Sequence, residues 1–177
     1  RWRFTNGKQL YDIKADPHQK NDIAAQHPEV VQELTEAYEE YWASMPNSED
    51  TLSRHLLGAE ECPEVVLNGM DWYKGGTPWH SGAFRSNSNG TWAVSVVRDG
   101  RYAFECRIFP READKPIGVT STTLTIGNIT KKVAVDATAK HATIEVELKA
   151  GDYDLETLLQ GSEGKPRGAL FVYVKAL

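Results

Sequence analysis

Apolar and polar residues alternate with a period of two along most of the second two-thirds of the chain. The alternation is clearest in five runs: Trp92, Val94 and Val96; Tyr102, Phe104, Cys106 and Ile108; Ile144, Val146 and Leu148; Tyr153, Leu155 and Leu158 or Leu159; and Leu170, Val172 and Val174. Successive side chains of a strand point to opposite faces, so this pattern predicts strands with one buried face. Turn-forming pairs such as Asp99-Gly100 and Gly127-Asn128 separate the runs. Seven or eight such strands without a helical period predict that residues 61–177 form an antiparallel β-sandwich of jelly-roll-like type.

Residues 1–60 follow a different pattern, which predicts an α+β segment. Segments 2–5 and 9–13 flank Asn6-Gly7, a pair that readily adopts the positive φ angles of a tight hairpin turn. Asp16-Pro17 marks a turn, and Asn21 or Asp22 can cap a short helical turn at Ile23–Gln26.

A long amphipathic helix is predicted from Pro28 to about Ser44, because proline fits the first helical turn. Its apolar stripe consists of residues spaced by three and four: Val30, Leu34, Ala37, Tyr38, Tyr41 and Trp42. Large aromatic residues gain about 1.5–3 kcal/mol each on burial, so the stripe is expected to dock on another surface, and part of it is exposed here if that partner is missing. A second short helix is predicted at about 49–58, ending at Gly58.

Composition and charge narrow the classes of function. Hydrophobic residues make up 40% and charged residues 25%, as is typical of a globular protein. The net charge of −5 and the lack of a basic cluster argue against nucleic acid. No apolar run approaches the roughly 20 residues that span a bilayer, so no membrane partner is expected. The first residue is Arg1 rather than Met, and a predicted strand begins directly at Trp2, which favours a fragment or a processed piece over removal of an initiator or tag.

Candidate chemistry is sparse, and neither a catalytic nor a metal site is expected within these residues. The five histidines have no metal-ligand spacing, no Cys-x-x-Cys occurs, and two free cysteines are favoured, with Cys106 on an apolar strand face. The aromatic-rich loop 68–85 offers four candidate substrate-binding residues: Trp72, Trp79, His80 and Arg85. The aromatic rings can stack on sugars, and the arginine can hold a sulfate or carboxylate. The alternative is that Trp72 and Trp79 fill the joint between the two regions.

A second pair of arginines lies at the end of a predicted strand. Arg107 and Arg111 flank Phe109-Pro110 and could bind an anion. The more common role of such a pair is a solvated strand end.

The N-terminal residues resemble the end of the catalytic domain of bacterial sulfatases, the arylsulfatase family of the alkaline-phosphatase-like superfamily. The resemblance is carried by Arg3-Phe4-x-x-Gly7-x-x-Leu10-Tyr11-Asp12-Ile13-x-x-Asp16-Pro17-x-x-Lys20-Asn21-Asp22-Ile23-Ala24, by His27-Pro28-Glu29-Val30-Val31 and by Tyr38–Trp42. It implies that residues 1–60 end the small C-terminal subdomain of a sulfatase. Residues 79–117 are similar, more weakly, to a β-sandwich appended to some bacterial sulfatases.

The resemblance implies a sulfuric ester hydrolase acting on aryl or carbohydrate sulfates. That family uses a formylglycine made from a Cys/Ser-x-Pro-x-Arg motif, together with a calcium ion. The motif is missing here; the near match Ser44-Met45-Pro46-Asn47-Ser48 ends in serine. We therefore expect an inactive C-terminal fragment whose partner is the missing N-terminal catalytic domain, with calcium and formylglycine in that domain and a periplasmic or secreted parent. The alternatives are a carbohydrate-binding module, with sulfated glycan as a candidate ligand, and an interaction domain.

Overall fold

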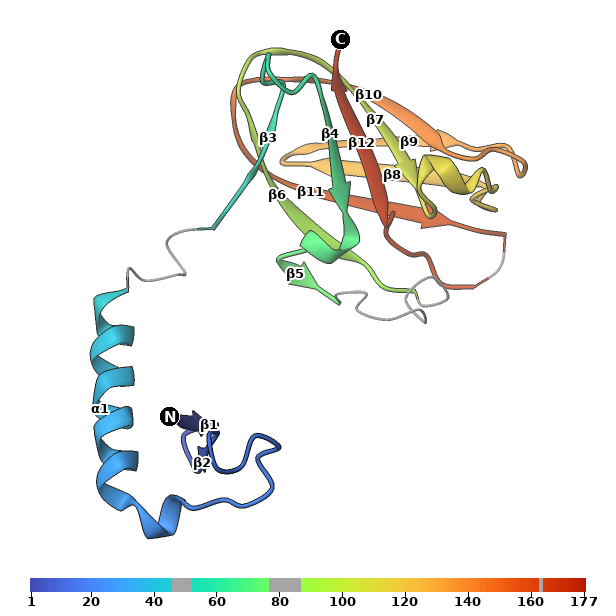
Figure 1. The fold of residues 1–177 in the computed structure, drawn as a ribbon. Helices are drawn as coiled ribbons and strands as arrows, with labels where there is room; N and C mark the ends of the chain where they lie inside the picture. The colour runs from blue at the N-terminus through green and yellow to red at the C-terminus, as the bar shows by residue number, and fades with distance from the viewer. Residues whose placement is uncertain (46–51, 77–86, 163) are drawn as a thin grey trace. The chain divides into compact units, whose positions relative to one another are not determined.

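A computed structural model gives the structure of residues 1–45, 52–76, 87–162 and 164–177. The chain divides into two units, Arg1–Leu52 and Ser53–Leu177 (Figure 1). The division precedes the boundary expected at residues 60 and 61, because a strand at His55–Leu57 pairs within the second unit.

The N-terminal unit begins with the predicted hairpin. Strands β1 (Trp2–Thr5) and β2 (Gln9–Asp12) pair antiparallel. Asn6 and Gly7 between them have φ angles of 56° and 65°, which confirms the tight turn that the sequence predicts.

Three aspartates fix the backbone after the hairpin. Their side chains accept hydrogen bonds from backbone N–H groups: Asp12 from Lys14 and Ala15, Asp16 from Lys20 and Asn21, and Asp22 from Leu10 and Ala24. Asp22 thereby ties β2 to the one-turn 3-10 helix at Ala24–Gln26, although the N-cap position of that helix is Ile23 rather than the predicted Asn21 or Asp22. The same three aspartates belong to the residues that resemble sulfatases, and in this structure each of them stabilises a turn or loop of the backbone.

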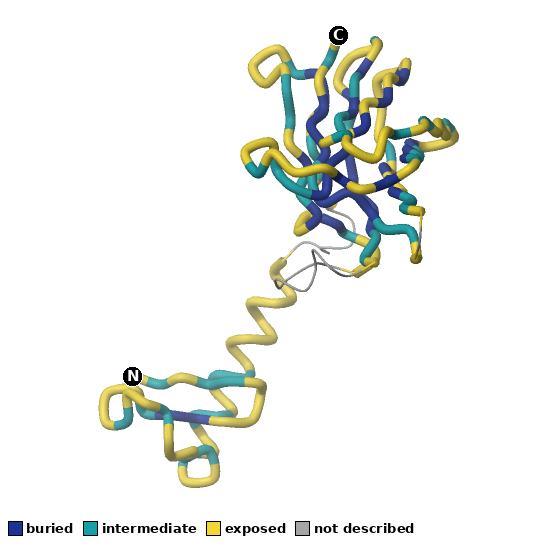
Figure 2. Tube along the Cα trace, turned by 90° about the vertical axis from the view of Figure 1, so that its right-hand side faces the viewer, coloured by how far each residue is buried: buried dark blue, intermediate teal, exposed yellow. Residues whose placement is uncertain are grey.

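Helix α1 (Pro28–Ser44) has the predicted bounds, and none of its side chains is buried. Its C-terminal aromatic residues are more than half exposed: Tyr38 59%, Tyr41 63% and Trp42 58% (Figure 2). Tyr38 and Trp42 stack on each other one turn apart, with ring centroids separated by 6.1 Å. The apolar stripe of the helix is therefore present and largely uncovered.

The second unit is a β-sandwich, which confirms the predicted fold class. One sheet runs in the order β3 (His55–Leu57), β6 (Gly90–Val96), β11 (Gly151–Gln160), β8 (Ser121–Ile126) and β9 (Ile129–Ala134), with β5 (Lys74–Gly75) also paired to β6. The other runs in the order β10 (Ala142–Leu148), β7 (Gly100–Arg107), β12 (Phe171–Ala176) and β4 (Glu64–Asn68). Every pairing is antiparallel except that of β3 with β6.

The short helix predicted at about 49–58 is wrong over its described part. His55–Leu57 forms strand β3, which pairs in parallel with Val94–Val96 of β6 and buries Leu57 completely. Gly58 then adopts a φ of +84° and ends the strand. Pairing with β6 outweighs the weak local helix signal. Residues 49–51 lie outside the described part.

The sandwich core contains most of the inward positions that the period-two pattern predicts, together with buried residues of β3, β4 and β8 that it does not. Its largest fully buried side chains include Trp92, Tyr102, Phe104, Leu57, Leu67, Leu124, Ile126, Ile144, Leu155 and Leu159. Leu159 rather than Leu158 is the inward residue of β11. Both cysteines are free thiols, as favoured, and burial raises the pKa of the Cys106 thiol to about 12. Two further 3-10 helices lie at Gly69–Asp71 and Arg111–Ala113.

Candidate functional site

Trp72 belongs to the sandwich core. It is 5% exposed, and its ring lies edge-on to Trp92 with the centroids 5.5 Å apart. A Cβ added at Gly90 would lie 2.5 Å from the Trp72 ring, so only glycine fits there. This packing leaves no open ring face on which a sugar could stack. The other three predicted contacts, Trp79, His80 and Arg85, lie outside the described residues.

Arg107 and Arg111 are held by carboxylates, which argues against the anion-binding role considered for them. Arg111 forms a bidentate pair with Glu64, with N···O distances of 2.7 and 3.1 Å, and binds Glu105 at 2.9 Å. Its guanidinium also lies 3.9 Å from the centroid of the Tyr173 ring. Arg107 is 7% exposed and donates to Glu105. Both arginines are therefore already paired with carboxylates, Arg107 at a buried position and Arg111 at an exposed one.

Glu105 lies between the two arginines, which lower the pKa of its carboxyl group. Its partial burial alone would raise the pKa, but hydrogen bonds from Arg111 and Arg107 outweigh that effect and lower the pKa from 4.5 to about 2. Glu105 therefore stays ionised over the whole physiological range. This cluster ties β7, β4 and the 3-10 helix Arg111–Ala113 together, which is a structural role.

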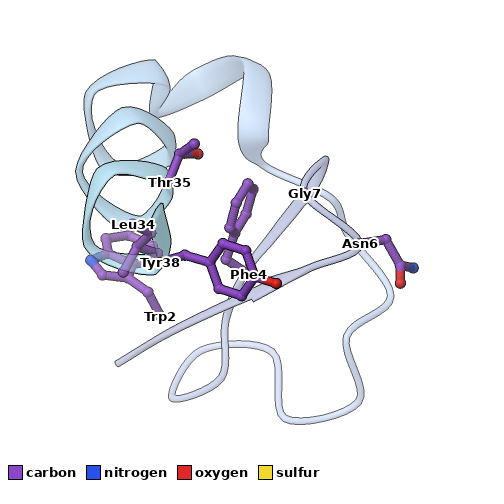
Figure 3. A pocket seen from close by; sticks show the side chains of 7 residues that line it. All are labelled: Trp2, Phe4, Asn6, Gly7, Leu34, Thr35 and Tyr38. Atoms are coloured by element: carbon purple, nitrogen blue, oxygen red, sulfur yellow. The ribbon is translucent and has the colours of Figure 1, made fainter. Parts of the chain in front are cut away.

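An open pocket of about 530 Å³ lies between the hairpin and α1 in the N-terminal unit (Figure 3). It is lined by Trp2, Phe4, Asn6, Gly7, Leu34, Thr35 and Tyr38. The Trp2 ring lies 5.1 Å from the His27 ring and 4.3 Å from the Arg1 guanidinium carbon. The lining carries no carboxylate, thiol or imidazole, so the pocket suits an apolar side chain rather than catalysis.

A second, smaller groove of about 270 Å³ lies on the outward face of the six-stranded sheet. It is lined by Asn89, Thr123, Thr125, Glu156, Thr157 and Leu158. Glu156 lies opposite Thr91 on one neighbouring strand and opposite Thr125 on the other. Thr91 donates its hydroxyl hydrogen to Glu156 at 2.8 Å. The groove thus combines hydroxyl, amide and carboxylate groups with an apolar leucine.

The same face continues along β11 with two paired acids. Tyr73 donates to Asp154 at 2.6 Å, and Lys74 pairs with the other oxygen of Asp154 at 3.2 Å. Asp152 pairs with Arg54 at 3.1 Å. Among the described residues, Glu156 is the acid of this row that has no basic partner.

No three His, Cys, Asp or Glu side chains gather as a metal site in the described part of the chain. The described helices include none with the length and apolar character needed to cross a membrane.

Comparison with known proteins links the chain to a sulfatase over a short segment. No family model matches. The chain is 64% identical over 31 residues to an N-acetylgalactosamine-6-O-sulfatase of Bacteroides thetaiotaomicron, a match that spans 18% of this chain and only 6% of that protein. Relatedness to sulfatases is therefore supported, weakly, by that segment.

Solved structures with a similar chain path include carbohydrate-binding modules. A CBM35 from Cellvibrio japonicus Abf62 has a TM-score of 0.41 and 18% identity, covering 63% of this chain and 91% of that one. A module from Cellvibrio mixtus lichenase 5A, solved with cellotriose, has a TM-score of 0.38 and 15% identity, covering 64% and 97%. A ruminal GH26 endo-β-1,4-mannanase has a TM-score of 0.42 and 16% identity, covering 64% and 26%.

Sequence reasoning did not find the groove on the six-stranded sheet. Its signal lies in the polar half of the alternation, where Glu156 and Leu158 separate the buried residues of β11. A period of two predicts which residues point outward, but not which strands lie side by side. Threonines of residues 121–125 become neighbours of Glu156 only through the pairing of β8 with β11.

Proposed function

We propose that this chain is the non-catalytic C-terminal region of a sulfatase whose complete form hydrolyses aryl or carbohydrate sulfates. The observation that carries the proposal is the 64% identity over 31 residues to a carbohydrate sulfatase. The resemblance of residues 3–42 to the end of a sulfatase catalytic domain supports it. In this proposal the missing domain would hold the formylglycine and the calcium ion, which would supply a nucleophile in the hydrated form of the aldehyde and stabilisation of the sulfate charge.

The exposed apolar surface of the N-terminal unit supports the proposal that a further domain packs against this unit. Trp2 and Phe4 of the hairpin and Tyr38 of α1 line an open pocket, and Tyr41 and Trp42 extend the apolar surface along the helix. Contiguous exposed aromatic surface of this kind marks a contact that a folded protein covers. We assign that cover to the preceding catalytic domain of the same protein, whose parent is proposed to be periplasmic or secreted.

Sulfate release tests the proposal. The protein encoded by the complete reading frame, supplied with calcium, is expected to hydrolyse 4-nitrophenyl sulfate or an O-sulfated saccharide, and to contain a Cys/Ser-x-Pro-x-Arg motif. The 177-residue chain alone is expected to release no sulfate under the same conditions. Turnover by the chain alone, or a complete reading frame without that motif, would overturn the assignment.

A second candidate function is carbohydrate binding by the sandwich, favoured by the groove on the six-stranded sheet. Saccharide sites combine a few convergent polar groups with apolar contact, and the groove offers both in Glu156, Asn89 and Leu158. The two functions are compatible, because a sandwich that holds a glycan can serve a sulfatase that acts on one.

A further inference from the structure

We propose that the groove on the outward face of the six-stranded sheet binds an uncharged saccharide, with Glu156 as its principal hydrogen-bond acceptor. The assignment rests on the proposed carbohydrate-binding function and adds to it the site and the charge of the ligand. This site lies on the strands β11, β8 and the start of β6 and is separate from the predicted contacts of the loop 68–85, three of which lie outside the described residues.

Strand pairing sets the shape of the site. Thr91, Glu156 and Thr125 lie side by side on three neighbouring strands and form one row. Leu158 and Thr123 face each other in the next row, and Asn89 borders it just before β6. Two strand spacings span about 10 Å, so the floor is a broad, shallow surface rather than a narrow ion pocket. Such a floor suits the flat shape of a sugar ring.

The polar groups match the hydroxyl groups of a sugar. Glu156 uses one oxygen to accept from Thr91, and a carboxylate has capacity for further donors on both oxygens. Hydrogen bonds from a hydroxyl to a carboxylate are stronger than those between neutral groups. Thr123 and Thr125 can each donate or accept, which suits hydroxyls whose orientation varies around a ring.

Leu158 supplies the apolar contact. It is 38% exposed and sits between Thr123 and the groove edge at Asn89. The C–H face of a pyranose can lie on such a side chain while the ring hydroxyls reach the polar groups on both sides. Since β11 alternates strictly, Leu158 is an apolar residue at an outward position that the sandwich core does not use.

The charges on this face disfavour a sulfated ligand. Asp152 and Asp154 are neutralised by Arg54 and Lys74, whereas no basic side chain in the described ranges pairs with Glu156. A sulfate placed over Glu156 would meet a carboxylate that no basic side chain of the described residues compensates. Lys132, which lies opposite Thr123, is exposed at the rim, where water and salt screen its charge. The expected ligand is therefore the neutral part of a glycan.

The experiment uses the 177-residue chain on an array of neutral oligosaccharides and their O-sulfated counterparts, followed by calorimetry with the strongest neutral ligand. We expect neutral glycans to bind and sulfation to weaken binding. Glu156→Gln is expected to weaken it by about tenfold or more, and Leu158→Ala and Thr123→Val each by a smaller factor. Matched controls on the other sheet are Glu147→Gln and Thr143→Val, both at exposed strand positions, which should leave affinity unchanged.

The possible failures are distinguishable. If no glycan of either kind binds, the carbohydrate-binding function itself is overturned. If glycans bind but Glu156→Gln and Leu158→Ala behave like the controls, the function stands and the groove is the wrong site. If sulfated glycans bind more tightly than neutral ones, the charge argument is wrong. Amide exchange of each variant, unchanged in the strands, shows that the fold is kept.

Discussion

The two units of this chain form secondary structure by different means. In the N-terminal unit, Leu10 and Tyr11 are the buried apolar residues of the described part, and α1 is held mainly by local signals. In the sandwich, every major strand contributes residues to one continuous core. Local hydrogen bonds and turns therefore specify the first unit, whereas burial specifies the second. A unit whose helix leaves its aromatic residues uncovered is expected to gain most of its stability from a partner.

Two tryptophans test this contrast most strongly. Trp92 is completely buried and donates to the backbone oxygen of Asn68 at 2.7 Å, whereas Trp42 is mostly exposed on α1. Trp92→Ala is expected to lower the free energy of unfolding of the sandwich by about 3–5 kcal/mol. Trp42→Ala is expected to change the free energy of unfolding of the N-terminal unit by less than about 0.5 kcal/mol. Urea unfolding followed by hydrogen exchange of each unit measures both. Similar losses in the two variants would contradict the contrast.

A matched pair of glycines gives a smaller difference of the same kind. Gly58 and Gly7 both have positive φ angles, of +84° and +65°. A Cβ at Gly58 would lie 2.2 Å from the hydroxyl oxygen of buried Tyr102, whereas a Cβ at Gly7 meets nothing within 4 Å. Gly7→Ala should cost about 1 kcal/mol of backbone strain, and Gly58→Ala about 1–3 kcal/mol more for overpacking. The loss of stability is measured by thermal unfolding of each unit. Equal losses in the two variants would show that the Tyr102 side chain moves aside without a free-energy penalty.

The pH dependence of the sandwich should carry the signature of Glu105. The folded-state pKa of about 2 lies below the ordinary 4.5, so the unfolded state binds more protons between these values. The stability that Glu105 contributes is complete above about pH 4.5 and is lost as the pH falls toward 2. We expect a loss of about 1–2 kcal/mol after solvent screening.

The Glu105→Gln variant isolates that contribution. It should be less stable than the parent chain at pH 7 and should lose less stability between pH 4.5 and 2. Glu147→Gln, at an exposed position of β10, is the control and should leave the pH profile unchanged. Urea unfolding at several pH values measures the effect. If the free energy of unfolding of Glu105→Gln and of the parent chain varied with pH in the same way, the ion pairs of Glu105 with Arg107 and Arg111 would not stabilise the fold.

The smallest expected effect lies in the N-terminal unit. Asp22 accepts from the backbone N–H groups of Leu10 and Ala24 at 3.1 and 3.0 Å. Asp22→Ala should destabilise this unit by about 1 kcal/mol and speed exchange at the Leu10 amide, while Asp22→Asn keeps the acceptor and should be closer to the parent chain. Exchange in the sandwich should not change. Faster amide exchange in the sandwich strands of Asp22→Ala would show that the stabilities of the two units are coupled.

The sequence predicts the features that depend on short-range chemistry. Asn6-Gly7 specifies the hairpin turn, Pro28 marks the start of α1, and alternation identifies the inward residues of β6, β7 and β10. It fails where distant pairing decides the structure. His55–Leu57 becomes a strand only because β6 lies beside it. The clear alternating runs do not include β8, where threonine occupies both inward and outward positions, or β9, none of whose residues is buried.

The candidate site was predicted less well than the fold, for a related reason. Trp72 lies among residue types that can form a sugar-binding surface, but it packs on Trp92. Unlike Trp92, it does not belong to an alternating run, so the sequence gives no periodic signal for its burial. Arg107 and Arg111 are neutralised by Glu64 and Glu105, of which Glu64 comes from a strand far away in sequence. A local sequence pattern cannot say which carboxylate a long side chain will reach.

Hydrogen exchange of α1 is the most direct test of the claim that the N-terminal unit belongs to a larger domain. It should be measured in the 177-residue chain and in the protein encoded by the complete reading frame. We predict that the amides of α1 exchange at least tenfold more slowly in the complete protein, because its catalytic domain covers Tyr38, Tyr41 and Trp42, while exchange in the sandwich strands stays the same. Equal exchange of α1 in the two proteins would contradict the account.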